Sequence, residues 1–479
     1  MGLSTINRRT FFDRVSDGLY GIGLSTLLMQ DLYGEKPHHN TPLPTNIRPR
    51  KPHFAPKAKA VIQFCMQGGP SQVDLFDPKP ALEKYHGKDA PEEFTKVAPA
   101  GRSMKGKVMR SHWKFSQYGQ SGAWVSDLLP HTAKEIDQIA IIRSMYSVHE
   151  NHEPACYKWQ TGETFPGHPT MGAWITYGLG SVNQNLPAYV VLADPDNRFA
   201  VNGVENWMSG YLPPLFQGTS IKSEGTPMLH LKPDYAEPAG VTAAKRNLIN
   251  ALDQMHKVKR PNQPVLDSRI ANYQMAARMQ VEATEALNIS EETEATRMMY
   301  GVGEKVTDNF GKRCIMARRL VERGVRFVQI YPQGQKWDNH SEIIKTLPAA
   351  CKESDKPCAA LLRDLRQRGL LDDVLVLWGG EFGRLPMAQG DYAKAGRDHG
   401  PSGFTNWMAG GGVKGGVVHG ETDDIGFGAV KDRVSIQDWH ATILHLLGMN
   451  HEKLYFDRNG LHERLTHTYP TRVVGEILA

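Results

Sequence analysis

Carboxylate and imidazole side chains recur in three short polar segments in the last third of the chain. They supply Asp338 and His340, then Asp398 and His399, and finally His419. Zinc and manganese sites use carboxylate and imidazole ligands, and residues two apart in an extended segment point the same way. We therefore expect these five residues to form a divalent metal site, with zinc, manganese or calcium as the ion. The alternative is that the aspartates cap helices and the histidines are ordinary loop residues.

Two further histidines and one glutamate are candidates for catalysis. His149 and His152 share the segment HENH, and Glu381 lies in the segment GGEFG. An imidazole such as His152 can accept a phosphoryl group, act as a general acid or bind a metal, and His149 is close enough to join it. The alternative is that this segment is a structural turn.

A glycine-rich turn and two arginines are candidates for substrate binding. Gly68 and Gly69 precede Ser71, and such a turn can offer backbone amides to an anion. Ser71 is a weaker candidate for a nucleophile, because no G-x-S-x-G motif surrounds it. Arg384 and Arg397 flank the metal candidates, where a guanidinium can bind sulfate or phosphate oxygens in pairs, or simply lie on the surface.

Most of these segments follow apolar runs that have the pattern of buried strands. Because ligands in an open α/β sheet bind at the carboxyl ends of strands, the polar segments are expected to share one edge. A helical pattern covers about 238–323, and another helix lies near 359–368. The expected strands are 60–66, 139–142, 188–192, 325–330 and 373–378.

Bulk composition is that of a globular protein without a nucleic-acid partner. Of 479 residues, 40% are hydrophobic and 22% charged, and the net charge of +5 is mild because Lys and Arg are dispersed. The five cysteines do not suggest a disulfide framework, although a Cys351–Cys358 bond is an option in an oxidising compartment. No segment reaches the roughly 18 apolar residues that span a bilayer.

The N-terminus has features of an export signal. Arg8 and Arg9 precede two phenylalanines and an apolar run over 19–29, which resembles a twin-arginine signal. We expect a signal region at 1–33, retained or cleaved, a linker at 34–59 and a single domain at 60–479. This organisation predicts a periplasmic or extracellular location, reached by the twin-arginine export route. The alternative is an amphipathic first helix with a chance arginine pair.

Longer motifs give a specific resemblance. The string at 57–80, with the core GGPSQVDLFDPKP, and the groups WDNH, WGGEFGR, RDHG and DWHATILHLLGM resemble an exported bacterial family known as domain of unknown function 1501. The resemblance implies membership of the alkaline phosphatase and sulfatase superfamily. It further implies an α/β fold, a three-layer α/β/α sandwich with a mostly parallel sheet and a helical insertion. Active relatives hold two divalent metals beside a Ser, Thr or formylglycine nucleophile.

Several positions depart from the superfamily pattern. Gln67 stands at the place of a metal-binding Asp, and Phe382, after Glu381, at the place of a ligand His. His152 stands at the nucleophile place, and Cys156 at the place of the following Arg. The pattern therefore predicts one reduced metal site in place of two.

Two functions follow from the resemblance and its departures. The first is an exported, metal-dependent hydrolase of a sulfate or phosphate ester on a small molecule or polysaccharide. The second is a catalytically silent relative that binds a glycan or a partner protein outside the cytoplasm.

Overall fold

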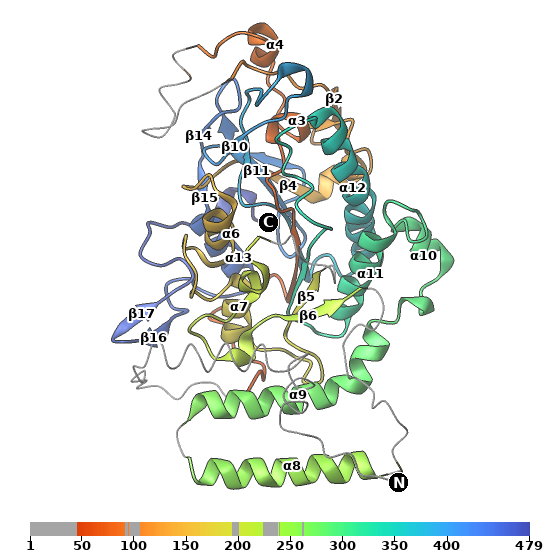
Figure 1. The fold of residues 1–479 in the computed structure, drawn as a ribbon, viewed down its shortest axis with the longest axis vertical. Helices are drawn as coiled ribbons and strands as arrows, with labels where there is room; N and C mark the ends of the chain where they lie inside the picture. The colour runs from red at the N-terminus through yellow and green to blue at the C-terminus, as the bar shows by residue number, and fades with distance from the viewer. Residues whose placement is uncertain are drawn as a thin grey trace, which may run out of the picture.

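A mixed, mostly parallel β-sheet forms the centre of the protein (Figure 1). The computed structural model describes residues 46–91, 94, 106–193, 201–223, 238, 240–260 and 263–479. The signal region expected at 1–33 lies outside these residues. In chain order the nine strands of the sheet are β1 (Ala60–Cys65), β4 (Ile139–Tyr146), β5 (Tyr189–Ala193), β6 (Thr219–Lys222), β7 (Phe327–Ile330), β8 (Val374–Gly379), β11 (Phe404–Ala409), β12 (Val417–His419) and β15 (Val434–Ser435).

The strand order places the polar segments at one edge of the sheet. Across the sheet the order is β12-β4-β11-β8-β1-β7-β5-β6, and β15 also pairs with β4. β1 is parallel to both β7 and β8, whereas β11 runs antiparallel between β4 and β8. β1, β7 and β8 are entirely buried, as the apolar runs predict for a sheet covered on both faces. Their carboxyl ends, and that of β4, therefore meet at the same edge.

Helices cover both faces of this sheet and give the three layers that the sequence predicts. Figure 1 shows α11 and α12 on one side of the strands and α6, α7 and α13 on the other. The helices are α3 (Gln72–Leu75), α4 (Ala81–Tyr85), α6 (His152–Thr161), α7 (Met171–Leu179), α8 (Val241–Val258), α9 (Pro264–Ala286), α10 (Glu294–Met299), α11 (Asp308–Glu322), α12 (Ile343–Gln367) and α13 (Ile436–Leu446).

Small sheets and short helices complete the described structure. The two-stranded sheets are β2 (Phe115–Tyr118) with β3 (Ala123–Ser126), β9 (Gly383–Arg384) with β10 (His399–Gly400), β13 (Glu421–Thr422) with β14 (Ala429–Lys431), and β16 (Phe456–Arg458) with β17 (Leu461–Glu463). The 3₁₀ helices are η1 (Thr132–Gln138), η2 (Gly203–Trp207), η3 (Pro214–Phe216), η4 (Ile289–Glu291), η5 (Tyr392–Lys394) and η6 (Gly475–Ile477).

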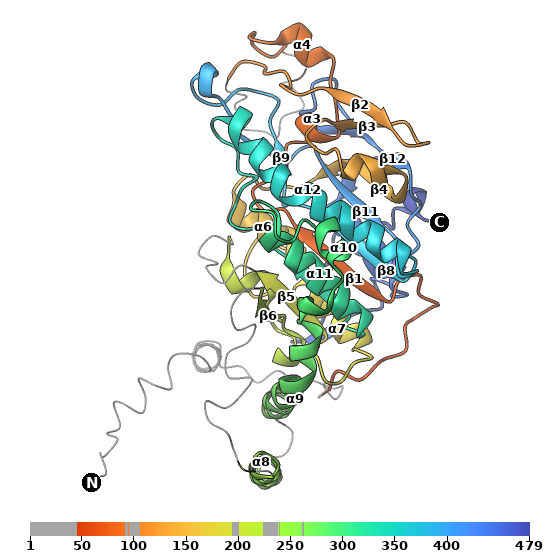
Figure 2. The ribbon, with the colours of Figure 1, turned by 90° about the vertical axis from the view of Figure 1, so that its right-hand side faces the viewer.

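The helical stretch expected at about 238–323 divides into two parts. Its last helix, α11, packs against β7 and α12 and belongs to the covering layer. Figure 2 shows α8 and α9 beyond the end of the sandwich, with α8 the farther of the two. Among the described helices, none combines the length and apolar character needed to cross a membrane.

The described half of the expected linker packs on the domain. The backbone amide of Arg50 donates to the carbonyl of Leu179, and that of Lys57 donates to Leu446. Ile47 is also buried in the core. Residues 46–59 therefore have no regular secondary structure but belong to the folded body, because their backbone amides and apolar side chains find partners there.

The optional Cys351–Cys358 disulfide is wrong, because both residues lie on α12. Seven residues of helix separate Cα atoms by about 10 Å, whereas a disulfide needs less than about 7 Å. All five cysteines are free and buried.

Helix α13 packs a histidine into the core. Ser435 caps the helix, and Asp438, the third helical residue, returns a hydrogen bond in a capping box. His440 is fully buried, and its Nε2 lies 2.9 Å from the carbonyl oxygen of Trp159. Burial lowers the pKa of His440 to about 3, despite that hydrogen bond.

The burial of His440 predicts a specific acid sensitivity. The pKa of His440 in the unfolded chain is about 6.5. Below this pH, His440 therefore binds a proton in the unfolded chain but not in the folded protein. Stability is therefore lost as pH falls from about 6.5 towards about 3, by roughly 2 kcal/mol at pH 5. In His440→Gln, which keeps a donor for Trp159, the stability difference between about pH 7.5 and pH 5 should shrink by that amount. Urea unfolding in the presence of a chelator measures the stability at each pH. An unchanged stability difference in the variant would show that buried His440 does not cause the acid sensitivity.

Candidate metal centre

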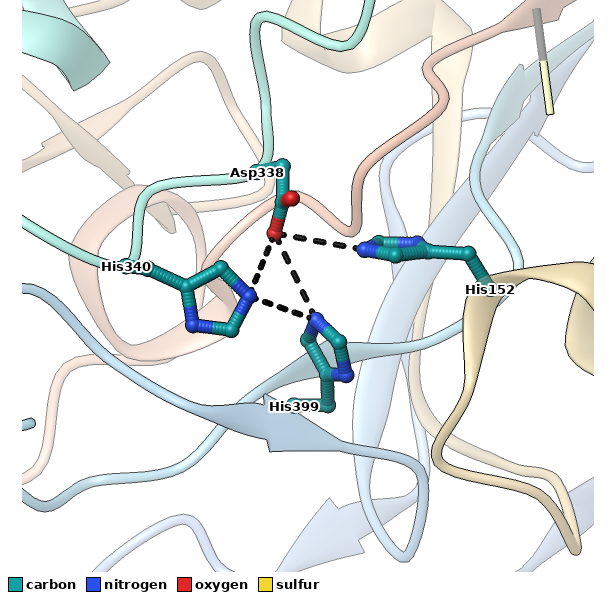
Figure 3. Close-up of side chains that lie close together, drawn as sticks. All are labelled: His152, Asp338, His340 and His399. Atoms are coloured by element: carbon teal, nitrogen blue, oxygen red, sulfur yellow. Dashed lines mark hydrogen bonds and ion pairs between the residues drawn. The ribbon is translucent and has the colours of Figure 1, made fainter.

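Four side chains meet beyond the carboxyl ends of the central strands (Figure 3). They are His152, Asp338, His340 and His399, and one ligand atom from each lies within 4.8 Å of all the others. Asp338 and His340 follow β7, His152 begins α6 after β4, and His399 begins β10. The sheet thus brings together residues that are up to 247 positions apart, from His152 to His399.

Asp338 is the centre of the cluster. Its Oδ1 lies 2.9 Å from Nε2 of His340, 3.2 Å from Nε2 of His152 and 3.4 Å from Nε2 of His399. The guanidinium of Arg384 donates to the same oxygen at 2.5 Å. Burial raises the pKa of Asp338, but the imidazoles and the guanidinium lower it far more, so the carboxylate stays ionised.

The three imidazoles differ in their electrostatic surroundings. Burial lowers the pKa of His152, but its contacts with Asp338 and Glu381 outweigh burial and raise it to about 9. The hydrogen bond to Asp338 raises the pKa of His340. Burial lowers the pKa of His399, and its hydrogen bond to Asp338 only partly offsets this. The carboxylate and the three imidazole nitrogens thus converge on one place, which is the arrangement that a bound cation requires.

Partners on the far side of two rings fix which nitrogen faces the centre. Nδ1 of His152 lies 2.8 Å from Oε1 of Glu381, and Nδ1 of His340 lies 2.5 Å from Oε1 of Gln389. If each Nδ1 donates to these oxygens, each Nε2 presents a lone pair to the cluster, which is the tautomer that metal ligands adopt. Nε2 of His152 is buried, and the Asp338 carboxylate lies 3.2 Å from it. The donor set therefore fits a bound cation.

Glu381 is a supporting carboxylate beneath the cluster. It is fully buried, and its Oε1 also accepts a hydrogen bond from the amide of Gly68 at 2.9 Å. Phe382 follows it and packs against the rings of His152 and His399, with centroids 4.9 and 4.6 Å away. Where the superfamily pattern has a ligand histidine, this chain thus has an apolar wall for the remaining cluster.

The glycine turn after β1 serves close packing. Gly68 and Gly69 have φ values of +110° and +84°, which suit glycine. A Cβ on Gly68 would lie 2.5 Å from the amide nitrogen of Asp338, and one on Gly69 would lie 2.7 Å from the ring of Phe382. The amide of Gly68 is also committed to Glu381, so the expected anion-binding role for this turn finds no support in the geometry.

Replacing Gly68 with alanine is expected to displace Asp338. The clash with backbone and the positive φ together should cost about 3 kcal/mol of stability or more. Gly87→Ala is the control, because Gly87 also has positive φ (+76°) but nothing within 4 Å of the added Cβ. It should cost about 1 kcal/mol. Urea unfolding measures both, and equal costs would show that close packing at Gly68 contributes nothing.

The expected substrate-binding arginines and serine have internal partners. Arg384 is fully buried and donates to Asp338 and to the carbonyls of Gly68 and Gly69. Arg397 is also fully buried and holds Asp74 through two hydrogen bonds, of 2.7 and 3.1 Å. The remaining candidate, the Ser71 hydroxyl, donates to the same Asp74 at 2.6 Å. These three side chains thus hydrogen-bond to groups within the protein, next to the cluster.

Three other candidates lie outside the cluster. Asp398 is at its rim, with Oδ1 3.9 Å from Nδ1 of His340. His149 instead accepts a hydrogen bond from the amide of Asn151 at 3.2 Å. His419 is on β12, an outermost strand of the sheet, four strands from β1. It is not one of the four clustered residues. Of the five ligands expected from sequence, Asp338, His340 and His399 thus meet in the cluster, joined by His152, whereas Asp398 and His419 lie outside it.

The outer partners of the site have roles that the sequence does not predict. Gln389 orients His340 and lies in no motif that metal chemistry would single out. Asp74 lies within the GGPSQVDLFDPKP motif and holds Arg397. His440, in the DWHATILHLLGM motif, is buried against the carbonyl of Trp159.

The protein is an α/β sandwich with a His/Asp cluster that can hold a metal ion. Its sequence identifies the family. The chain belongs to the family described as "Protein of unknown function (DUF1501)", whose match covers residues 58–478. No curated protein matches the chain.

Solved structures show distant similarity. The chain is similar to Ps i-CgsB in complex with k-i-k-neocarrahexaose, with 10% identity, 84% of this chain and 75% of that chain covered, and a TM-score of 0.36. It is similar to the PsFucS1 sulfatase from Pseudoalteromonas sp., with 12% identity, 84% and 68% coverage, and a TM-score of 0.34. A TAB5 alkaline phosphatase mutant with Mg bound shows 10% identity, 74% and 92% coverage, and a TM-score of 0.31.

Proposed function

We propose that this protein is an exported, metal-dependent hydrolase of sulfate or phosphate esters. The observation that carries the proposal is the cluster of His152, Asp338, His340 and His399, with ligand atoms within 4.8 Å of one another. Export rests on the paired arginines at the N-terminus. The ester class rests on the sequence resemblance to the alkaline phosphatase and sulfatase superfamily.

The types of the ligand side chains indicate which metal ion the site prefers. Three imidazoles and one carboxylate suit zinc or manganese, whereas calcium prefers six to eight oxygen ligands. We therefore favour zinc or manganese over the calcium that the sequence also allowed. A divalent metal held here supplies Lewis-acid chemistry for the hydrolysis of an ester.

The residues around the cluster hold its ligand side chains in position. Glu381 and Gln389 hold two of the imidazoles in one tautomer, and Arg384 holds Asp338. The Ser71 hydroxyl is buried against Asp74, so we propose water as the nucleophile, without a covalent intermediate on serine. His152 then acts as a ligand and not as a phosphoryl acceptor.

Hydrolysis of a panel of esters tests this function. Purified protein loaded with zinc or manganese should release nitrophenol from at least one aryl phosphate monoester, phosphate diester or sulfate ester. His399→Ala should abolish this activity, whereas His462→Ala should leave it intact. His462 is the matched control because its side chain is 69% exposed on β17, away from the cluster.

A second candidate function has one specific observation in its favour. Arg384 and Arg397, expected to bind an ester, are both fully buried and used internally. This arrangement fits a silent relative that uses the metal centre structurally and binds a glycan or protein. Stoichiometric metal with no turnover on any ester of the panel would favour this second function.

A further inference from the structure

Helix α8 exposes a row of large apolar side chains. It has 18 residues, none of them buried. Figures 1 and 2 show it at the far end of the molecule, separated from the sandwich by α9. The exposed fractions are 61% for Leu248, 54% for Ile249, 55% for Leu252, 61% for Met255 and 81% for Val258.

The polar face of α8, and not its apolar face, contacts the rest of the protein. Asn250 accepts a hydrogen bond from Gln274 of α9 at 3.3 Å, and Lys257 pairs with Asp267 of α9 at 2.6 Å. Residues 250 and 257 are seven apart and share one face. At 100° per residue Leu248 and Leu252 lie about 160° and Met255 about 140° from Asn250, so these three side chains face away from α9.

The charge of α8 indicates which kind of surface the apolar row binds. Residues 241–260 carry five Lys and Arg but a single acidic residue, Asp253. A second copy of the helix would bring ten basic residues to one interface against two acidic ones. An anionic bilayer surface instead accepts the apolar row between its headgroups and attracts the net positive charge of this segment, although Lys257 itself pairs with Asp267 of α9.

The dimensions of α8 restrict how it would meet a bilayer. Its 18 residues span about 27 Å, but it is not apolar enough to cross a membrane. Strong amphipathicity with basic flanks is typical of helices that lie in the interface plane.

We propose that α8 is an interfacial membrane-binding helix that holds the protein on an anionic lipid surface. Leu248, Leu252 and Met255 enter the boundary between headgroups and acyl chains. β10, which carries His399, lies towards the opposite end of the molecule from α8 in Figure 1, so a bound protein holds the metal centre at a distance from the bilayer. This inference does not depend on the proposed hydrolase function.

A single environment-sensitive dye on α8 tests the proposal in the full chain. All five native cysteines are buried, so a cysteine introduced by Leu252→Cys can be labelled selectively with a nitrobenzoxadiazole dye. Vesicles of phosphatidylcholine with phosphatidylglycerol should raise its emission at least about threefold and shift it to the blue. Vesicles of phosphatidylcholine alone should have a much smaller effect, and added salt should weaken the response.

Gln254→Cys with the same dye is the matched control, because residue 254 is exposed on another face of the same helix. Its emission should change less than about 1.5-fold, and Met255→Cys should respond as Leu252→Cys does. The local dye excludes a contribution from the apolar N-terminal run. No response at 252 and 255, or equal responses at 254, would overturn the proposal. So would a dimer in sedimentation that Leu252→Glu dissociates, because the row would then be a self-association surface.

Discussion

His340→Ala is expected to remove the metal from this protein. Purified protein reconstituted with zinc or manganese should contain about one ion per chain by elemental analysis. Outer partners of metal ligands typically contribute about 10- to 100-fold in affinity, so loss of a ligand itself should cost at least about 100-fold. Competition with a fluorescent chelator gives the affinities of both proteins.

Two control variants make this result specific. Asp398→Asn changes a carboxylate at the rim, 3.9 Å from the ring of His340, which the geometry does not use as a ligand. His462→Ala removes an exposed imidazole on β17. Both should retain the ion with affinity within about threefold of the unaltered chain. Loss of metal in Asp398→Asn would restore Asp398 to the ligand set, and retention in His340→Ala would remove the proposed centre.

Arg397→Met is expected to destabilise the whole fold. Arg397 and Asp74 are both fully buried, and the guanidinium also donates to the carbonyl of Met109 at 3.0 Å. Removing the arginine leaves a carboxylate in the core without its counter-ion, which typically costs about 3–5 kcal/mol. Urea unfolding at neutral pH measures this loss directly.

A double-mutant cycle separates the ion pair from simple loss of packing. Asp74→Asn keeps the shape of the side chain and removes its charge, so it leaves the arginine unpaired. The double variant Asp74→Asn with Arg397→Met should be more stable than the sum of the two single effects predicts, by more than about 1 kcal/mol. Additive effects would show that the two charges do not stabilise each other.

The sequence predicted the layers of the fold and part of the site. Alternating apolar runs located β1, β4, β5, β7 and β8 to within a few residues, apart from the C-terminal extent of β4. Because three parallel neighbours end at one edge, residues that follow them had to lie close together. The sequence therefore predicts that Asp338, His340 and Glu381 lie near one another, as they do.

The remaining residues could not be placed because sequence does not give strand order or burial. His419 also follows a strand, but β12 lies four strands from β1, about 19 Å across the sheet. From sequence, Arg384 and Arg397 were predicted to bind substrate, with a surface position as the alternative, whereas the structure encloses both. A charged side chain is enclosed in this way only when partners distant in the chain, such as Asp74, surround it.

The five buried thiols allow this protein to fold in either a reducing or an oxidising compartment. Burial raises the pKa of Cys156, Cys314, Cys351 and Cys358 well above the usual value, and that of Cys65 as well. They are therefore poor nucleophiles and resist oxidants and thiol exchange. Since no covalent cross-link holds the fold together, the native state forms without an oxidase or isomerase. The same conformation is thus compatible with reducing and oxidising surroundings, and passage between them requires no redox step.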